Sequence, residues 1–210
     1  MRHWNAPFVD MTMPSPALVA FTLLMTAWLV FVAVFVFRPR AARATEVRRD
    51  RFGTLGIALQ TVGYAIVWST RRGGFELLLG VHTRARWHYL LAIVIGLLAF
   101  ASALLTLAAV RALGKQWALA ARLVASHELI RTGPYALVRH PIYTGMLGLL
   151  VATALTLTHP LTIVPAVALF VIGTLVRTHA EERLLRSAFG GAYDDYARKV
   201  PTLIPWRLPR

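Results

Sequence analysis

The side chains best suited to chemistry gather in two polar segments of the C-terminal half. The first segment contains Arg139, His140, Pro141, Tyr143 and Gly145. The second contains Arg177, Glu181 and Glu182. Together they offer guanidinium, imidazole, phenol and carboxylate groups, which can bind a ligand that carries both signs of charge. The chain has no cysteine, which excludes a cysteine nucleophile, a thiolate metal site and a disulfide.

The spacing within each segment is typical of helix ends. Pro141 suits the first turn of a helix, and that helix end would present free N–H groups to a carboxylate or a phosphate. Glu181 and Glu182 are expected near the opposite, partially negative end of a later helix, with Arg177 one turn before Glu181. If both ends lie on the same side of a membrane, one pocket between them would suit a zwitterion such as S-adenosylmethionine.

Long uncharged runs indicate the elements that must position these groups. Hydrophobic residues make up 57% of the 210 residues, above the share of a soluble domain. Five runs stand out, namely Ala17–Phe37, Thr54–Thr70, His88–Val110, Tyr143–Thr158 and Leu161–Val176. About 20 apolar residues cross a bilayer as a helix. The pattern therefore predicts an all-α membrane protein with about five transmembrane helices, a C-terminal helical hairpin and a cytosolic C-terminal segment.

Basic residues predict the orientation of these helices. With five spans and the N-terminus outside, 18 of the 23 Lys and Arg residues fall in segments that would be cytoplasmic. The positive-inside rule therefore favours an outer N-terminus and a cytoplasmic C-terminus, in what we expect to be a bacterial inner membrane. The same rule and anionic lipids account for the net charge of +14 without a nucleic acid partner. Arg71 and Arg72 fit this orientation poorly, so a re-entrant second run stays open, and Phe75–Val81 is too short to span.

The two polar segments resemble the isoprenylcysteine carboxyl methyltransferase and phospholipid methyltransferase group of integral membrane enzymes. That group shows Gly-Pro-Tyr, then Arg-His-Pro-x-Tyr-x-Gly, then a Glu-Glu pair ahead of Leu, and then Phe-Gly-x-x-Tyr-x-x-Tyr. All of these motifs occur here in the same order, between Gly133 and Tyr196. The ordered combination beside hydrophobic runs is specific, whereas Arg-His-Pro alone would be a weak signal.

The resemblance implies a cytosol-facing pocket for S-adenosylmethionine. Its cofactor-binding residues would be Arg139, His140, Pro141, Tyr143, Gly145, Glu181 and Glu182. Arg177 would orient an anionic group of the acceptor, and Arg177 and Glu181 are the expected catalytic residues. The chain would then divide into an N-terminal segment (1–16), N-terminal transmembrane helices (17–110) and a catalytic half (111–210).

The resemblance also implies a lipophilic acceptor, either a lipid or a small molecule, that enters from the bilayer. Carboxyl O-methylation of an isoprenylcysteine-like thiol compound is the preferred interpretation. A phospholipid amine and a small lipophilic thiol stay open as acceptors. Two other functions also stay open, a membrane reductase resembling the sterol reductases and a non-catalytic accessory protein.

Each candidate residue also has a purely structural interpretation. Arg139 suits a membrane anchor, His140 a helix cap, and Tyr143 an interfacial aromatic belt. Gly145 suits close helix packing, and the glutamate pair suits a solvated helix face.

A metal site is a further alternative for the two polar segments. His140, His179, Glu181 and Glu182 would have to surround one ion. Their spacing matches no familiar zinc motif such as His-Glu-x-x-His, and the helix-end interpretation already accounts for the glutamates. The sequence therefore predicts no metal.

Overall fold

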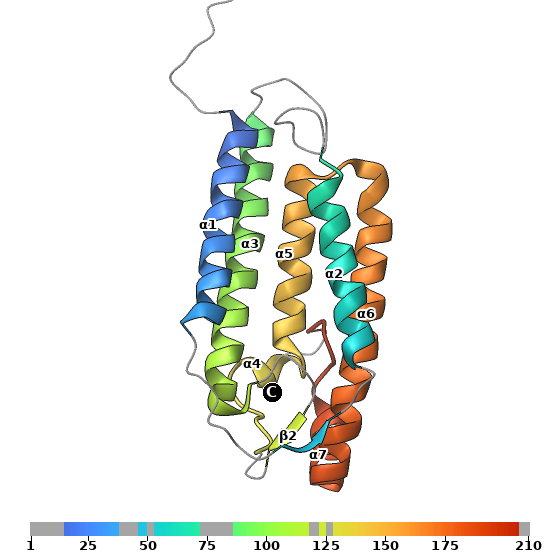
Figure 1. Cartoon of the computed structure of the whole chain (residues 1–210). Coiled ribbons are helices and arrows are strands. Elements are labelled where there is room, and N and C mark those ends of the chain that lie inside the picture. The colour runs from blue at the N-terminus through green and yellow to red at the C-terminus, as the bar shows by residue number, and fades with distance from the viewer. Residues whose placement is uncertain are drawn as a thin grey trace, which may run out of the picture.

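The computed structural model describes residues 15–37, 46–49, 53–71, 86–117, 122–124 and 128–205. Within these ranges long helices form a bundle, and the smaller elements gather at one end of it (Figure 1). The helices are α1 (Pro16–Val36), α2 (Gly53–Ser69), α3 (Arg86–Leu113), α4 (Pro134–Leu137), α5 (Pro141–Leu157), α6 (Pro160–Phe189) and α7 (Gly191–Lys199). The other elements are a 3-10 turn at Gly114–Gln116 and the strands β1 (Glu46–Arg49) and β2 (Arg122–Val124).

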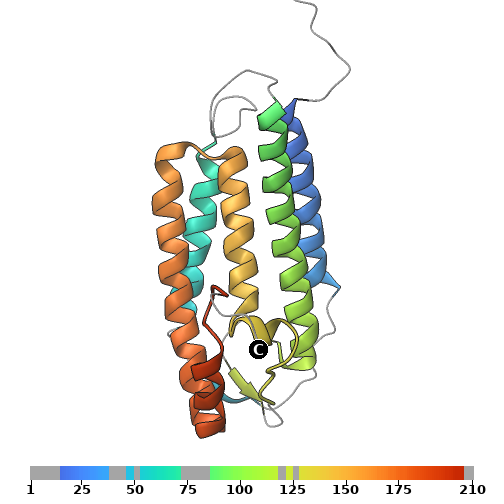
Figure 2. The same ribbon diagram turned by 180° about the vertical axis from the view of Figure 1, so that it is seen from behind.

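The five long helices run side by side, as opposite views of the bundle show (Figures 1 and 2). Three of them, α1, α3 and α6, are long and apolar enough to cross a membrane. The helix α5 is a shorter apolar helix of 17 residues, and α2 also has 17 residues, which gives each a length of about 26 Å. The prediction of a helical membrane protein is confirmed, while the count of five crossings stays a prediction. The predicted interfacial segment Phe75–Val81 lies outside the described residues.

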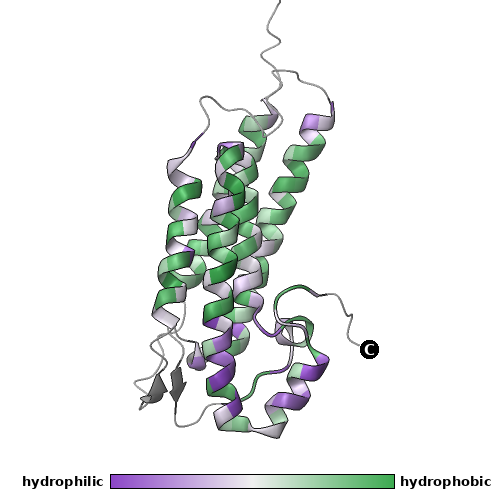
Figure 3. Cartoon of the chain, turned by 90° about the vertical axis from the view of Figure 1, so that its right-hand side faces the viewer, coloured by the Kyte–Doolittle hydropathy of each residue, from purple (hydrophilic) through white to green (hydrophobic). Residues whose placement is uncertain are grey.

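Hydropathy changes along the axis of the bundle. Apolar residues cover most of the long helices, while polar residues dominate α7 and the adjoining part of α6 (Figure 3). The helix α6 continues without interruption for 30 residues, about 45 Å, which exceeds a hydrocarbon core of about 30 Å. The predicted run Leu161–Val176 and the charged stretch Arg177–Ala188 are therefore parts of one helix, whose charged part extends past its apolar part.

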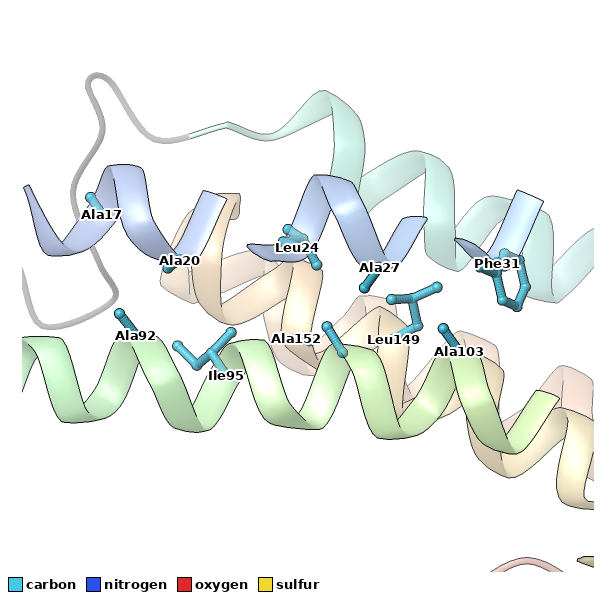
Figure 4. Close-up of a cluster of buried hydrophobic side chains, with 11 residues drawn as sticks. Ala17, Ala20, Leu24, Ala27, Phe31, Ala92, Ile95, Ala103, Leu149 and Ala152 are labelled. Carbon is cyan, nitrogen blue, oxygen red and sulfur yellow. The ribbon is translucent and has the colours of Figure 1, made fainter. Parts of the chain in front are cut away.

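Small side chains bring α1, α3 and α5 together. The Ser15 hydroxyl accepts a hydrogen bond from the Leu18 N–H at 3.2 Å and caps α1, and Pro16 occupies its first turn. Alanines of α1 then face alanines of α3, and Leu149 and Ala152 of α5 complete this buried cluster (Figure 4). Small residues allow close approach of membrane helices, which associate through packing because lipid supplies no hydrophobic driving force between them.

Glycines bring α2 into backbone contact with α6. A Cβ atom on Gly63 would lie 2.8 Å from the Ala166 carbonyl oxygen, and one on Gly173 would lie 2.7 Å from the Gly56 carbonyl oxygen. These distances are too short for any side chain larger than hydrogen. The helix α2, which corresponds to the predicted run Thr54–Thr70, therefore packs along the longer helix α6, although α2 has only 17 residues.

The turn between α5 and α6 is hydrogen-bonded to the end of α2. The Thr158 hydroxyl donates to the Val67 carbonyl at 2.9 Å, and the His159 N–H donates to the Thr70 carbonyl at 2.8 Å. This turn lies between the predicted runs Tyr143–Thr158 and Leu161–Val176, and α5 and α6 form a helical hairpin around it.

The all-α fold class is confirmed, and one short pair of strands accompanies the helices. Strands β1 and β2 pair antiparallel, with Arg49 opposite Arg122. They connect the polar segment after α1 to the polar segment after α3. Backbone groups outside helices need hydrogen-bond partners, and a short ladder supplies them. A search for long apolar runs cannot detect such a pairing, because the strands have only four and three residues.

The close contact of α2 with α6 predicts the effect of enlarging Gly63. Gly63→Val should lower the free energy of unfolding by about 1–3 kcal/mol, because the new side chain would press on the α6 backbone. Thermal unfolding in detergent measures this change. The control is Ala65→Val on the same helix, where Ala65 is exposed on the bundle surface. Equal unfolding midpoints for the two variants would contradict the contact.

Candidate active site

Arg139 lies between α4 and α5 and reaches Glu182 on α6. Its Nε and Nη2 atoms donate to Glu182 Oε1 at 3.0 and 2.8 Å. Nη1 donates to the carbonyls of Ala197 and Val200 at 2.8 and 2.6 Å, and Nη2 also donates to the Thr202 hydroxyl at 2.8 Å. These five hydrogen bonds match the five N–H donors of a guanidinium. Arg139 therefore ties α6 to the end of α7 and to the segment that follows it.

Backbone pairing reinforces this attachment. The Arg139 N–H donates to the Pro201 carbonyl at 2.8 Å, and the His140 N–H donates to the Thr202 carbonyl at 3.1 Å. The segment after α7 consequently runs beside the start of α5 (Figure 1). The segment after α7 is therefore held in place on one side of the charged groups.

His140 bridges the two glutamates from its position before α5. Its Nδ1 lies 3.4 Å from Glu181 Oε2, and its Nε2 lies 3.2 Å from Glu182 Oε1. Burial alone would lower the pKa of His140, but hydrogen bonds and charge from both carboxylates outweigh it and raise the pKa above its ordinary value. A ring with a carboxylate at each nitrogen is best satisfied as an imidazolium, which donates from both.

Tyr143 joins Glu181 to Arg177. The Tyr143 hydroxyl donates a short hydrogen bond to Glu181 Oε1, and its ring stacks on that of His140 at a centroid distance of 5.8 Å. The Arg177 guanidinium lies over the Tyr143 ring, 4.8 Å from its centroid. The Glu181 side chain is 26% exposed, against 6% for His140. Glu181 is therefore the more accessible of the two for a ligand.

Gly145 and Pro141 lie on α5 as structural residues. A Cβ atom on Gly145 would lie 2.6 Å from the Ser102 carbonyl oxygen and would collide with the Thr106 hydroxyl. The glycine thus brings α5 against α3, and its contact with a cofactor stays a prediction. Pro141 occupies the first turn of α5, as predicted, and His140 takes the N-cap position without a side-chain capping bond.

Six of the predicted residues form one connected group, which we call the charge cluster: Arg139, His140, Tyr143, Arg177, Glu181 and Glu182. The structural alternatives fit these residues poorly. The Arg139 side chain is only 12% exposed and is not a lipid-facing anchor, and Glu182 is buried rather than part of a solvated face.

His179, the fourth residue of the metal alternative, is exposed on α6. Across the described ranges, no group of three or more His, Cys, Asp or Glu side chains is placed to hold a metal ion.

Sequence reasoning missed several partners of the charge cluster. Gln60 of α2 accepts a hydrogen bond from Arg177 at 2.9 Å, and a lone amide in an apolar run was a usable signal for it. The carbonyls of Ala197 and Val200 carried no signal, because every residue has a carbonyl. Tyr196, part of the recognised motif, is a structural residue whose hydroxyl donates to the Tyr135 carbonyl at 2.7 Å and holds α7 against α4.

The geometry provides separate positive and negative recognition groups. Glu181 offers a partly exposed carboxylate that is fixed by Tyr143 and His140. The first turn of α5, which no side chain caps, offers backbone N–H groups to an anion. Arg177 adds a guanidinium on the side of α2. Such a set can orient a zwitterion and a second, anionic molecule at the same time.

Part of the chain matches the model of a known protein family. Residues 94–187 match the model of the isoprenylcysteine carboxyl methyltransferase (ICMT) family, which confirms the resemblance predicted from the motifs. A probable protein-S-isoprenylcysteine O-methyltransferase of Oryza sativa subsp. indica is 39% identical over 80 residues, 38% of this chain and 42% of that protein.

Two further relatives align over similar lengths. The protein-S-isoprenylcysteine O-methyltransferase of Saccharomyces cerevisiae is 35% identical over 82 residues, 38% of this chain and 34% of that protein. The cobalt-zinc-cadmium resistance protein CzcN of Cupriavidus metallidurans is 38% identical over 82 residues, 38% of this chain and 37% of that protein. The chain thus spans 34–42% of the length of these relatives.

The hydrogen bonds of Arg139 predict that lysine cannot replace it. Arg139→Lys keeps the charge but loses the planar set of donors, so the free energy of unfolding should fall by about 1–3 kcal/mol. Thermal unfolding and protease cleavage near residue 200 would both report the loosened segment. The control is Arg198→Lys, since Arg198 is 72% exposed and pairs only at the surface with Asp195. An Arg139→Lys variant as stable as this control would contradict the assignment.

The raised pKa of His140 predicts a pH-dependent contribution to stability. A folded-state pKa above the unfolded value gives stabilisation that is complete below about pH 6.5 and lost as the pH rises through the folded-state pKa. The difference in unfolding midpoint between the unmodified protein and His140→Gln should therefore narrow as the pH rises above about 6.5. The exposed His179→Gln variant controls for general effects of removing a histidine. A constant difference over that range would argue against the protonated bridge.

Proposed function

From the match of residues 94–187 to the ICMT family, we propose that this membrane protein transfers a methyl group from S-adenosylmethionine to a lipophilic acceptor. The proposed acceptor carries a carboxylate, as in an isoprenylcysteine-like thiol compound. Carboxyl O-methylation takes preference over the phospholipid amine and the lipophilic thiol, because the relatives from rice and yeast are named for the isoprenylcysteine reaction.

One observation carries this proposal. All six members of the charge cluster lie within the segment that matches the family, and they come together although up to 43 residues separate the partners in sequence. Buried ionisable groups are costly unless paired, and clusters of them are typical of functional sites. The site at this end of the bundle is therefore the place where we assign the chemistry.

The donor set fits S-adenosylmethionine. Glu181 presents a partly exposed carboxylate to the cationic part of the cofactor, and the uncapped first turn of α5 presents N–H groups to its carboxylate. Tyr143 and His140 hold Glu181 in place. When bound, the cofactor supplies an electrophilic methyl group on a sulfonium. Glu182 is held by Arg139 and His140, so we assign it a positioning role beside Glu181.

Arg177 is the proposed group for the acceptor. Its guanidinium lies over Tyr143 and so stands next to the residue that holds Glu181. A carboxylate acceptor bound there would be oriented by a charge-assisted hydrogen bond. Orientation of two reactants can supply about 7–11 kcal/mol of the barrier reduction. The protein thus needs no nucleophile of its own, in keeping with the absence of cysteine.

We further propose that the charge cluster faces the cytosol and that α1, α2, α3, α5 and α6 all cross the membrane. The apolar surfaces of α1, α3 and α6 leave large side chains exposed, as lipid contact requires. A lipophilic acceptor would reach the site from this surface. The distribution of Lys and Arg supports an outer N-terminus and a cytoplasmic C-terminus in a bacterial inner membrane.

Titration of S-adenosylmethionine into the detergent-purified protein tests the proposal. The unmodified protein should bind saturably, and Glu181→Gln should weaken binding by about 1–3 kcal/mol, because a charged partner becomes neutral. Calorimetry measures both constants. Glu128→Gln serves as the matched control, since Glu128 is exposed in the loop before α4.

The same titration separates the rival functions. Absence of binding to a folded sample would overturn the methyltransferase proposal, and binding of a reduced nicotinamide instead would favour the reductase.

A further inference from the structure

Gln60 is a polar residue that the apolar environment of α2 does not explain. It lies in the second apolar run, and only 3% of its surface is exposed. An amide buried in a membrane helix is costly unless hydrogen-bonded. Its position is also outside residues 94–187, the part of the chain that matches the family. Whatever Gln60 does is therefore contributed by the N-terminal half.

Both ends of the Gln60 amide are bonded to α6. Nε2 donates to the Thr174 hydroxyl at 2.8 Å, and Oε1 accepts from Arg177 Nη1 at 2.9 Å. The Thr174 hydroxyl itself donates to the Phe170 carbonyl at 2.9 Å, so only its oxygen lone pairs are left for Gln60. This order of donors and acceptors fixes the orientation of the amide, because the reversed amide would place an acceptor against the Thr174 oxygen and a donor against Arg177.

The same face of α2 also shapes the path of the Arg177 side chain. A Cβ atom on Gly56, one turn before Gln60, would collide with Arg177 Cγ and lie 3.3 Å from its Cδ. The aliphatic part of Arg177 thus lies against the bare backbone at Gly56, and its guanidinium ends between the Gln60 amide and the Tyr143 ring. Two helices therefore determine where this charge is placed.

We infer that Gln60 is a positioning residue that sets Arg177 for recognition of the carboxylate of the acceptor. This inference rests on the proposed function and adds α2 to the acceptor side of the site. Gln60 suits the task because a neutral acceptor atom directs the guanidinium without cancelling its charge. A glutamate in the same place would hold Arg177 equally well but would compete with an anionic acceptor.

The test compares Gln60→Met with the unmodified full-length protein. The acceptor probe is an S-farnesylated cysteine derivative with a free carboxylate, and its carboxamide serves as a competitor. Gln60→Met should raise KM for the carboxylate about tenfold, equivalent to 1.4 kcal/mol or one hydrogen bond to a charged group. The Kd for S-adenosylmethionine should stay unchanged, and the preference for carboxylate over carboxamide should narrow.

Two further variants keep the test independent of folding. Gln60→Glu retains the side-chain length and the hydrogen bond from Arg177 but loses the donor to Thr174, and it should raise KM for the carboxylate with no change in cofactor Kd. Thr61→Val on the same helix is the matched control, since Thr61 is exposed and bonds only to its own helix, and it should behave as the unmodified protein.

The outcomes distinguish this inference from the proposed function. Unchanged KM values in both Gln60 variants, or equal losses of cofactor and acceptor binding, would overturn the role of Gln60 while leaving the methyltransferase in place. Failure of the unmodified protein to bind S-adenosylmethionine would overturn the proposed function and this inference with it.

Discussion

Two adjacent carboxylates on α6, Glu181 and Glu182, need compensation for their burial. Glu182 is only 11% exposed, and an unpaired charge in such a place would cost several kcal/mol. The compensation comes from the start of α5, where Arg139 and His140 lie within hydrogen-bonding distance. The start of α5 must therefore stay beside the charged part of α6, and the short turn at the opposite end of the hairpin allows this antiparallel arrangement.

Close packing of the long helices helps to keep the start of α5 beside the charged part of α6. Gly63 and Gly173 let α2 lie on α6, and Gly145 lets α5 lie on α3. Each glycine removes a side chain at a helix crossing, so the positions of the helix axes are set by backbone contact. Such contacts leave little freedom for α6 to rotate. These helix contacts thereby fix which side of α6 faces the start of α5.

The sequence was sufficient for what depends on composition and local motif. Apolar runs predicted α1, α2, α3 and α5 to within a few residues, and Pro141 predicted the first turn of α5. The helix α6 was predicted only in its apolar part, and the glutamate pair lies seven and eight residues before its end at Phe189 rather than at a helix end. What escaped prediction depends on backbone groups, which look alike at every position. The pairing of β1 with β2 and the carbonyl partners of Arg139 belong to this class. The contact of Gly145 with α3 depends on how α5 and α3 are shifted relative to each other along their axes. No local sequence pattern encodes that shift.

The hydrogen-bond acceptors of Arg139 lie far from it along the sequence, and this affects the order in which the protein can assemble during synthesis. Its acceptors are separated from it by 43, 58, 61 and 63 positions along the chain. Because synthesis proceeds from the N-terminus, α5 is complete while those acceptors do not yet exist. The hydrogen bonds of the guanidinium to protein therefore form only as α6, α7 and the residues after α7 are made, and the set is complete only when Thr202 has emerged. Assembly of the charge cluster is thus completed late in synthesis, after α5 and most of α6 have been made.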